Sequence, residues 1–193
     1  MEMRMGIPIQ ELRYAPINVE RELIEKTKDA MNLLLGVKFK ITDIKVGCVE
    51  KGDLTDELFN NDFHYFYLTI ISRLSTGVEG YFIVTTDMAS SDELSFLLTG
   101  RHMRIVNEFE ESILEEICNI MLGTFVSELA NWTGTPVDYT IPKIVIYSTA
   151  DELKGLFKEI KAFTSNKIQI IKFTLSCDSP QIDLVNMMVL ASR

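Results

Sequence analysis

The sequence predicts an α+β fold, in which a mostly antiparallel six-stranded sheet carries the two longest helices on one face. Strand-like segments come in pairs joined by short turns, which is typical of hairpins and not of the regular alternation seen in parallel sheets. Two long segments, 18–35 and 108–132, instead repeat their apolar residues at helical spacing. Each of these helices therefore has one face to bury against the sheet.

Each element follows from a local signal. Residues 1–17 hold two prolines and show no clear period, so we interpret them as an N-terminal arm that is either irregular or a short strand. Strands are indicated by alternation or by runs of β-branched and aromatic residues, and helices by helical apolar spacing or by a stop such as Gly36 or Gly100. The predicted helices lie at 18–35, 87–98, 108–132 and 150–163. The predicted strands lie at 37–49, 64–74, 78–85, 137–147, 167–176 and 182–191.

Some elements carry finer predictions. The strand at 37–49 alternates as a half-buried strand would, with a bulge near Thr42 and Asp43. Residues 50–62 are acidic and form a predicted loop. Pro142 interrupts the strand at 137–147 and indicates a sheet edge or the start of a strand. No linker rich in Pro, Ser or Gly divides the chain, so we expect 1–193 to form one domain.

Composition excludes several classes of protein. The chain of 193 residues is 47% hydrophobic and has a net charge of −9, which fits a globular protein and argues against nucleic acid as a partner. No apolar run reaches the roughly 18 residues of a membrane span, and no secretory signal is visible, so we expect a cytoplasmic protein with no membrane partner. The three widely spaced cysteines fit reduced thiols better than disulfides or a zinc site.

The helix at 108–132 has one apolar and one polar side. Its apolar side gathers Leu114, Ile117, Cys118, Met121, Leu122, Phe125, Leu129 and Trp132. Ser112, Glu116 and Asn119 stand on the polar side, spaced four and three residues apart, and so lie in one row. The helix contains six Glu and no Lys or Arg, so it is a poor phosphate binder by itself.

These residues form a pattern with Pro142, which follows Asn119 after twenty-two intervening residues. The pattern [Asp/Ser]-x3-Glu-x2-Asn-x22-Pro resembles the signature of the CheC/CheX/FliY family of chemotaxis phosphatases. The stretches 116–123 and 137–143 resemble the family's helix and following strand, and the upstream sequence looks like the CheX branch. One departure is Cys118, where members usually have Gly. Because Cys118 faces the core, we expect it to alter packing more than chemistry.

The resemblance implies a CheC/CheX-like fold and the dephosphorylation of a phosphorylated CheY-type response regulator. Asn119 would hold the attacking water, because an amide both donates and accepts hydrogen bonds and carries no charge. Glu116 would bind a lysine of the partner, while Ser112 would add a hydrogen bond and Pro142 would shape the neighbouring strand. We expect no cofactor or metal of its own, Mg²⁺ in the partner regulator, and a homodimer as in the CheX branch.

Other interpretations stay open. A non-catalytic module of the same fold could dock on a response regulator or on the flagellar switch, and a divergent member could serve another signalling pathway. Asp29, Asn32 and Gly36 repeat the spacing of Glu116, Asn119 and Gly123, as a degraded internal repeat or by coincidence. We interpret Asp29 and Asn32 as ordinary helix surface. Neither His64 nor His102 has metal-ligand neighbours at useful spacing.

Overall fold

The computed structural model describes residues 17–50, 67–75, 79–102, 108–147 and 167–191. The helices within these residues are α1 (Ile17–Leu35), α3 (Met88–Thr99) and α4 (Glu108–Thr133). The strands are β1 (Lys40–Glu50), β2 (Tyr67–Ser75), β3 (Gly80–Asp87), β4 (Asp138–Tyr139), β5 (Lys143–Tyr147), β6 (Lys167–Asp178) and β7 (Gln181–Ala191). The predicted acidic loop, the helix at 150–163 and, apart from residue 17, the N-terminal arm lie outside the described residues.

Every strand pairing in the sheet is antiparallel. The strand order is β1-β6-β7-β3-β2-β4, and β5 pairs with β2 as well, so β4 and β5 follow one another along the same edge. Seven strands therefore fill six positions across the sheet. The break between β4 and β5 falls at Pro142, which has no backbone N–H to give to a ladder. The predicted antiparallel α+β fold and the strand start after Pro142 are confirmed.

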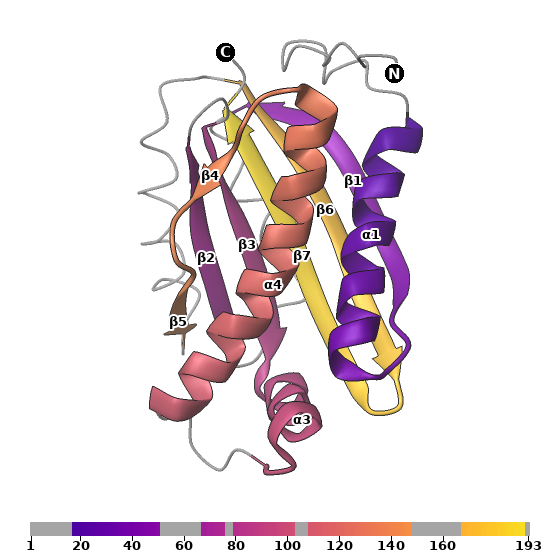
Figure 1. Ribbon diagram of the computed structural model, residues 1–193, viewed down its shortest axis with the longest axis vertical. Coiled ribbons are helices and arrows are strands. Elements are labelled where there is room, and N and C mark those ends of the chain that lie inside the picture. Colours follow the sequence, from indigo (N-terminus) through magenta and orange to yellow (C-terminus); the bar gives the residue numbers. More distant parts are fainter. Residues whose placement is uncertain (1–16, 51–66, 76–78, 103–107, 148–166, 192–193) are drawn as a thin grey trace.

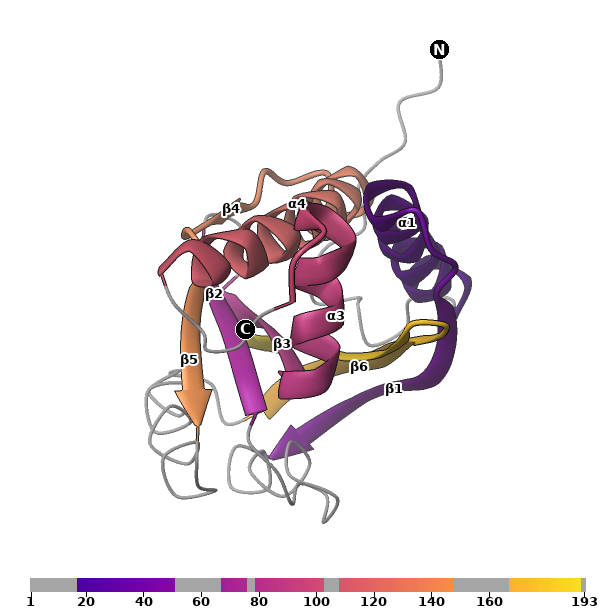
Figure 2. The ribbon, with the colours of Figure 1, turned by 90° about the horizontal axis from the view of Figure 1, so that it is seen from below.

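The helices α1 and α4 cross the same face of the sheet, as Figures 1 and 2 show from two directions. The shorter helix α3 lies near their lower ends in Figure 1. Gly36 and Gly100 follow α1 and α3 with φ angles of 68° and 71°, which confirms the predicted stops at a conformation that favours glycine. Across the described helices, none combines the length and the apolarity of a membrane span.

The core lies between these helices and the sheet. The ring centroid of Phe125 in α4 is 5.2 Å from that of Phe82 in β3 and 6.2 Å from that of Phe173 in β6. All three rings are fully buried, and each burial contributes roughly 1.5–3 kcal/mol. The predicted apolar side of α4 is buried from Leu114 to Leu129, with Trp132 partly buried at its end. This packing fixes which side of α4 faces outward.

The edge strand β1 differs from its prediction in one respect. Its register against β6 shifts between Ile41 and Asp43, which confirms the predicted bulge. The expectation of a half-buried strand was wrong, because Ile44 and Val46 are 44% and 38% exposed. Among the strands that the structure describes, β1 pairs with β6 only and ends the sheet, and there alternating apolar residues do not by themselves bury the side chains.

Candidate functional site

The polar row of α4 points away from the core. Ser112 and Glu116 are exposed and Asn119 is partly exposed, whereas Ile117 and Cys118 between them are buried. Because positions three and four apart fall on the same side of a helix, the three polar side chains lie together along the outer face. The structure thus brings Ser112, Glu116 and Asn119 into one surface row that another protein can reach. Their catalytic roles stay a prediction.

The side chains of this row have no partner among the residues that the structure describes. Among the described residues, Ser112, Glu116 and Asn119 make no side-chain hydrogen bond or ion pair. Further along α4 the situation is different, since Glu128 accepts a hydrogen bond from Lys26 of α1 with an Nζ–Oε1 distance of 3.1 Å. Glu128 therefore joins two helices, while the donors and acceptors of the row remain available to a ligand.

Gly123 extends the row by one turn and marks a close approach. A β-carbon built at Gly123 would lie 3.2 Å from the hydroxyl oxygen of Tyr139, which is closer than ordinary van der Waals contact. Tyr139 belongs to β4, and it pairs with Leu74 of β2. A tyrosine ring from the sheet edge therefore reaches the outer face of α4, one turn beyond Asn119.

The link between β4 and β5 holds two further residues of interest. Pro142 is buried immediately before β5 and is therefore not part of the exposed polar row. Its role in shaping the neighbouring strand stays a prediction. Ile141, the residue before it, is 80% exposed. No pattern in the sequence singled out Tyr139 or Ile141. A glycine inside a long helix was the one available signal that something approaches α4 there.

The outer face of α4 is acidic. Glu108 and Glu116 are exposed, Glu111 and Glu115 are partly exposed, and α4 contains no Lys or Arg. Acidic side chains near a helix N-terminus each stabilise the helix by about 0.3–1 kcal/mol through the macrodipole. The same charges repel a phosphoryl group and attract a cation. This face is therefore suited to a partner that brings its own positive charges.

The second copy of the pattern, on α1, serves the fold. Asn32 Oδ1 accepts a hydrogen bond of 2.7 Å from the backbone N–H of Phe39, and so closes the turn that joins α1 to β1. Asp29 has a side chain that is 71% exposed, with Oδ1 at 3.4 Å from Lys28 Nζ. The interpretation of Asp29 as ordinary helix surface fits the structure, whereas Asn32 is a structural residue whose amide is engaged.

Cys118, the departure from the family pattern, packs in the core. It is 2% exposed, and burial raises the pKa of its thiol, with a smaller contribution from Glu115. A buried thiol with a raised pKa holds its proton and is a poor nucleophile. Cys118 therefore contributes to packing, as the sequence predicted.

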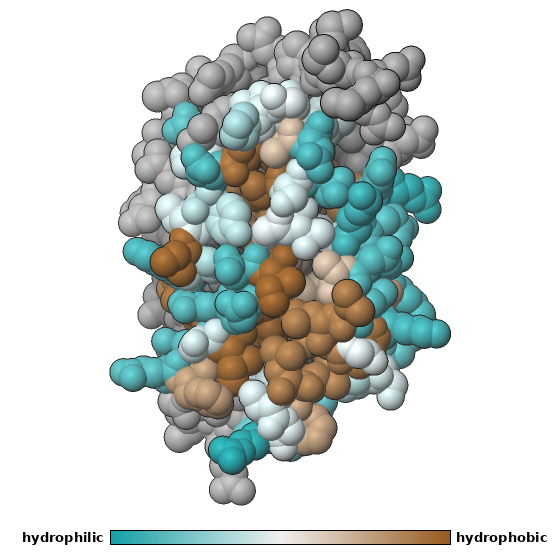
Figure 3. Space-filling model, in the orientation of Figure 1, coloured by the Kyte–Doolittle hydropathy of each residue, from teal (hydrophilic) through white to brown (hydrophobic). Residues whose placement is uncertain are grey.

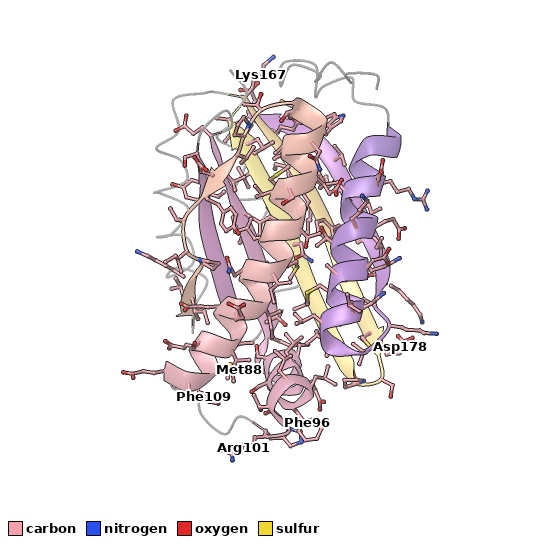
Figure 4. All side chains as sticks on the ribbon, viewed as in Figure 1. Met88, Phe96, Arg101, Phe109, Lys167 and Asp178 are labelled. Carbon is pink, nitrogen blue, oxygen red and sulfur yellow. The ribbon has the colours of Figure 1, made fainter. Side chains whose placement is uncertain are left out.

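The lower end of the molecule carries apolar surface and a histidine. Figure 3 shows a hydrophobic area between the lower ends of α4 and α1, and Figure 4 places Phe109 and Phe96 at this end. The ring of Phe96 stacks on His102 with centroids 4.4 Å apart, and His102 Nδ1 lies 2.8 Å from Asp92 Oδ2. In the part of the chain that the structure describes, no group of three or more His, Cys, Asp or Glu could hold a metal ion.

Known structures share this fold. No protein-family model matches the chain. Thermotoga maritima FliY is similar with a TM-score of 0.64 at 13% identity, covering 96% of this chain and 91% of FliY. A CheC-like superfamily protein from a Shewanella species matches with a TM-score of 0.62 at 12% identity, covering 91% of this chain and 98% of its own.

A third similar structure comes from a complex. A chain of the Borrelia burgdorferi CheX–CheY–BeF₃–Mg²⁺ complex matches with a TM-score of 0.60 at 17% identity, covering 92% of this chain and 100% of that one. At these identities the similarity shows the fold. The protein therefore has the fold of the CheC, CheX and FliY chemotaxis proteins, and the resemblance inferred from the motif is confirmed at that level.

Proposed function

We propose that the protein is a phosphatase that removes the phosphoryl group from a phosphorylated CheY-type response regulator. The observation that carries the proposal is the row of Ser112, Glu116 and Asn119, which is accessible on α4 and, among the described residues, makes no side-chain contact that would occupy it. The fold supports the proposal, because a chain of the same fold occurs in a complex of CheX with CheY.

Asn119 is the residue that places the water. An aspartyl phosphate is already reactive, so a catalyst needs chiefly to hold a water molecule in line with the phosphorus. The amide oxygen of Asn119 accepts a hydrogen bond from this water, and its Nδ2 group donates one, without a charge that repels the phosphoryl oxygens. The water oxygen bonds to phosphorus as the bond to the aspartyl oxygen breaks, which leaves the regulator's carboxylate and inorganic phosphate.

Glu116 fixes the docking. Its carboxylate stands one turn from Asn119 on the same outer face and pairs with a lysine beside the regulator's phosphorylation site. The cations of the reaction, Mg²⁺ and this lysine, belong to the regulator, because α4 itself carries none. Ser112 adds a hydrogen bond at the end of the row, and Pro142 sets the course of the β4–β5 link. The homodimer implied by the resemblance stays a prediction.

The test measures release of inorganic phosphate from each CheY-type regulator of the source organism after phosphorylation with acetyl phosphate. We expect Asn119→Ala to slow release by about 100-fold with unchanged binding, because a misplaced reacting group costs about that much. We expect phosphate release to be slower still with Asn119→Asp, since the new negative charge repels the phosphoryl group. Asn32→Asp is the matched control; its carboxylate still accepts the Phe39 N–H, so its rate equals that of the wild type.

Two outcomes would overturn the proposal. Release that is equally fast with Asn119→Ala removes the catalytic assignment. A wild-type protein that binds a regulator without accelerating release supports the alternative, a non-catalytic binding module of the same fold.

A further inference from the structure

The link between β4 and β5 forms a fixed flank beside the polar row. In Figures 1 and 2 this part of the chain runs alongside α4. Its first end is held by the pairing of Ser75 with Asp138 and of Leu74 with Tyr139, and its second end by the burial of Pro142 and the start of β5. Since both ends are anchored on β2, the side chains of the link keep a set position relative to the helix.

This flank presents two apolar side chains, Tyr139 and Ile141, which we call the β4–β5 ledge. Tyr139 is 36% exposed while its hydroxyl lies against Gly123, so part of the ring faces solvent next to the row. The surface of Ile141 is 80% exposed. Single exposed apolar side chains are ordinary, and Leu33 on α1 is one. The ledge differs because it continues a polar row whose side chains make no hydrogen bond or ion pair to any residue that the structure describes.

The charges around the ledge indicate what covers it. The adjacent face of α4 is acidic, with Glu116 exposed, and Asp138 is exposed on β4. Lys143, the first residue of β5, is an exposed cation next to the link. A complementary surface therefore combines a cation, opposite Glu116, with an apolar patch at its side. A response regulator that presents a lysine to Glu116 supplies the first of these features.

We propose that the β4–β5 ledge is the docking surface for an apolar patch beside the regulator's phosphorylation site, an inference that rests on the proposed function. The ledge excludes water from the flank of the contact. A charge pair acts more strongly where bulk water is excluded, and apolar contacts around a central pair commonly supply that exclusion. The ledge thus sets affinity for the regulator, whereas Asn119 sets the rate of hydrolysis.

The experiment separates affinity from rate. Binding of the BeF₃⁻-loaded regulator and the kcat and KM of phosphate release are measured for Ile141→Ala, Ile141→Gln and Tyr139→Ala. We expect Ile141→Ala and Tyr139→Ala each to raise Kd and KM about 10-fold, with kcat within roughly two-fold of wild type. Ile141→Gln keeps the bulk of the side chain but loses affinity to the same degree. Tyr139→Phe keeps the ring and the affinity. Leu33→Ala, at an equally exposed position on α1, changes nothing.

The outcomes distinguish the two proposals. The ledge proposal is overturned if Ile141→Ala leaves Kd unchanged, if Ile141→Gln binds with full affinity, or if Leu33→Ala loses as much affinity as Ile141→Ala. In each of these cases the proposed function stands if the wild-type protein still releases phosphate. A wild-type protein that binds the regulator but releases no phosphate overturns the proposed function, and a loss of binding in Ile141→Ala then still supports the ledge. Circular dichroism confirms that each variant is folded.

Discussion

Gly123 offers a direct test of how β4 packs on α4. It is the one glycine of a 26-residue helix, at a position where alanine would favour the helix. The perturbation is Gly123→Ala, made both in the wild-type chain and in a Tyr139→Phe chain. The second background removes the oxygen atom that stands 3.2 Å from the new methyl group and leaves the ring in place.

The expected magnitudes follow from two opposing effects. Replacing glycine by alanine inside a helix stabilises a protein by about 1 kcal/mol. In the wild-type chain the Tyr139 hydroxyl must first move by a few tenths of an ångström. Since Tyr139 as a whole is 36% exposed and has room to shift, we expect the movement to offset about half of the gain. In the Tyr139→Phe chain nothing opposes the methyl group, and the full stabilisation of about 1 kcal/mol should appear.

The assay is equilibrium unfolding in urea of the four proteins of this cycle. A stabilisation of about 1 kcal/mol also raises the melting temperature by about 2–4 °C for a chain of this size. We expect Gly123→Ala to be more stabilising in the Tyr139→Phe chain by about 0.5 kcal/mol. If the two backgrounds give equal changes in the free energy of unfolding, Tyr139 does not touch α4 at Gly123. The basis of the β4–β5 ledge would then be lost.

Further predictions concern the row, its structural copy and the thiols. Asn32→Ala should lower the free energy of unfolding by about 1–2 kcal/mol, because a backbone N–H loses its acceptor, while phosphate release per folded molecule is unchanged. Glu116→Gln should raise KM about 10-fold and weaken its dependence on salt; an equally steep salt dependence would argue against a charge pair. The protein alone should not hydrolyse acetyl phosphate, since α4 supplies no cation; measurable turnover would contradict the need for a regulator. Ellman's reagent should modify exposed Cys48 quickly, and buried Cys118 and Cys177 only after unfolding in guanidinium; three fast thiols would contradict the burial.

The parts of the fold that the sequence predicted are those governed by local rules. Helical spacing identified α4 and its buried side from Leu114 to Leu129, because an apolar stripe along a helix is stable only when it packs against a core. Pro142 predicted a strand start because the missing N–H acts at its own position. The bulge between Ile41 and Asp43 likewise showed as a break in alternation.

The missed features depend on contacts between distant parts of the chain. Alternation predicted burial for Ile44 and Val46, yet burial also depends on what packs against the strand. A period in the sequence cannot indicate that β1 ends the sheet of described strands. In the sequence, Gly123 stood out only as part of a repeated spacing, because a glycine inside a helix does not identify the residue that approaches it. Tyr139 reaches it only because the two-residue strand β4 pairs with β2, a pairing too short to leave a pattern in the sequence.

Asn32 and Asn119 show what distinguishes a structural residue from a candidate site. Both occupy the same position of the same spacing, each four residues before a glycine. The amide oxygen of Asn32 accepts a hydrogen bond from the N–H of Phe39, so a ligand would have to break a hydrogen bond that the fold needs. Asn119 makes no such bond within the described residues, and therefore loses nothing when it binds a water or a partner. An amide that is free but surrounded by acids is useful only against a positively charged surface. This makes the regulator's lysine and Mg²⁺ the other half of the proposed site.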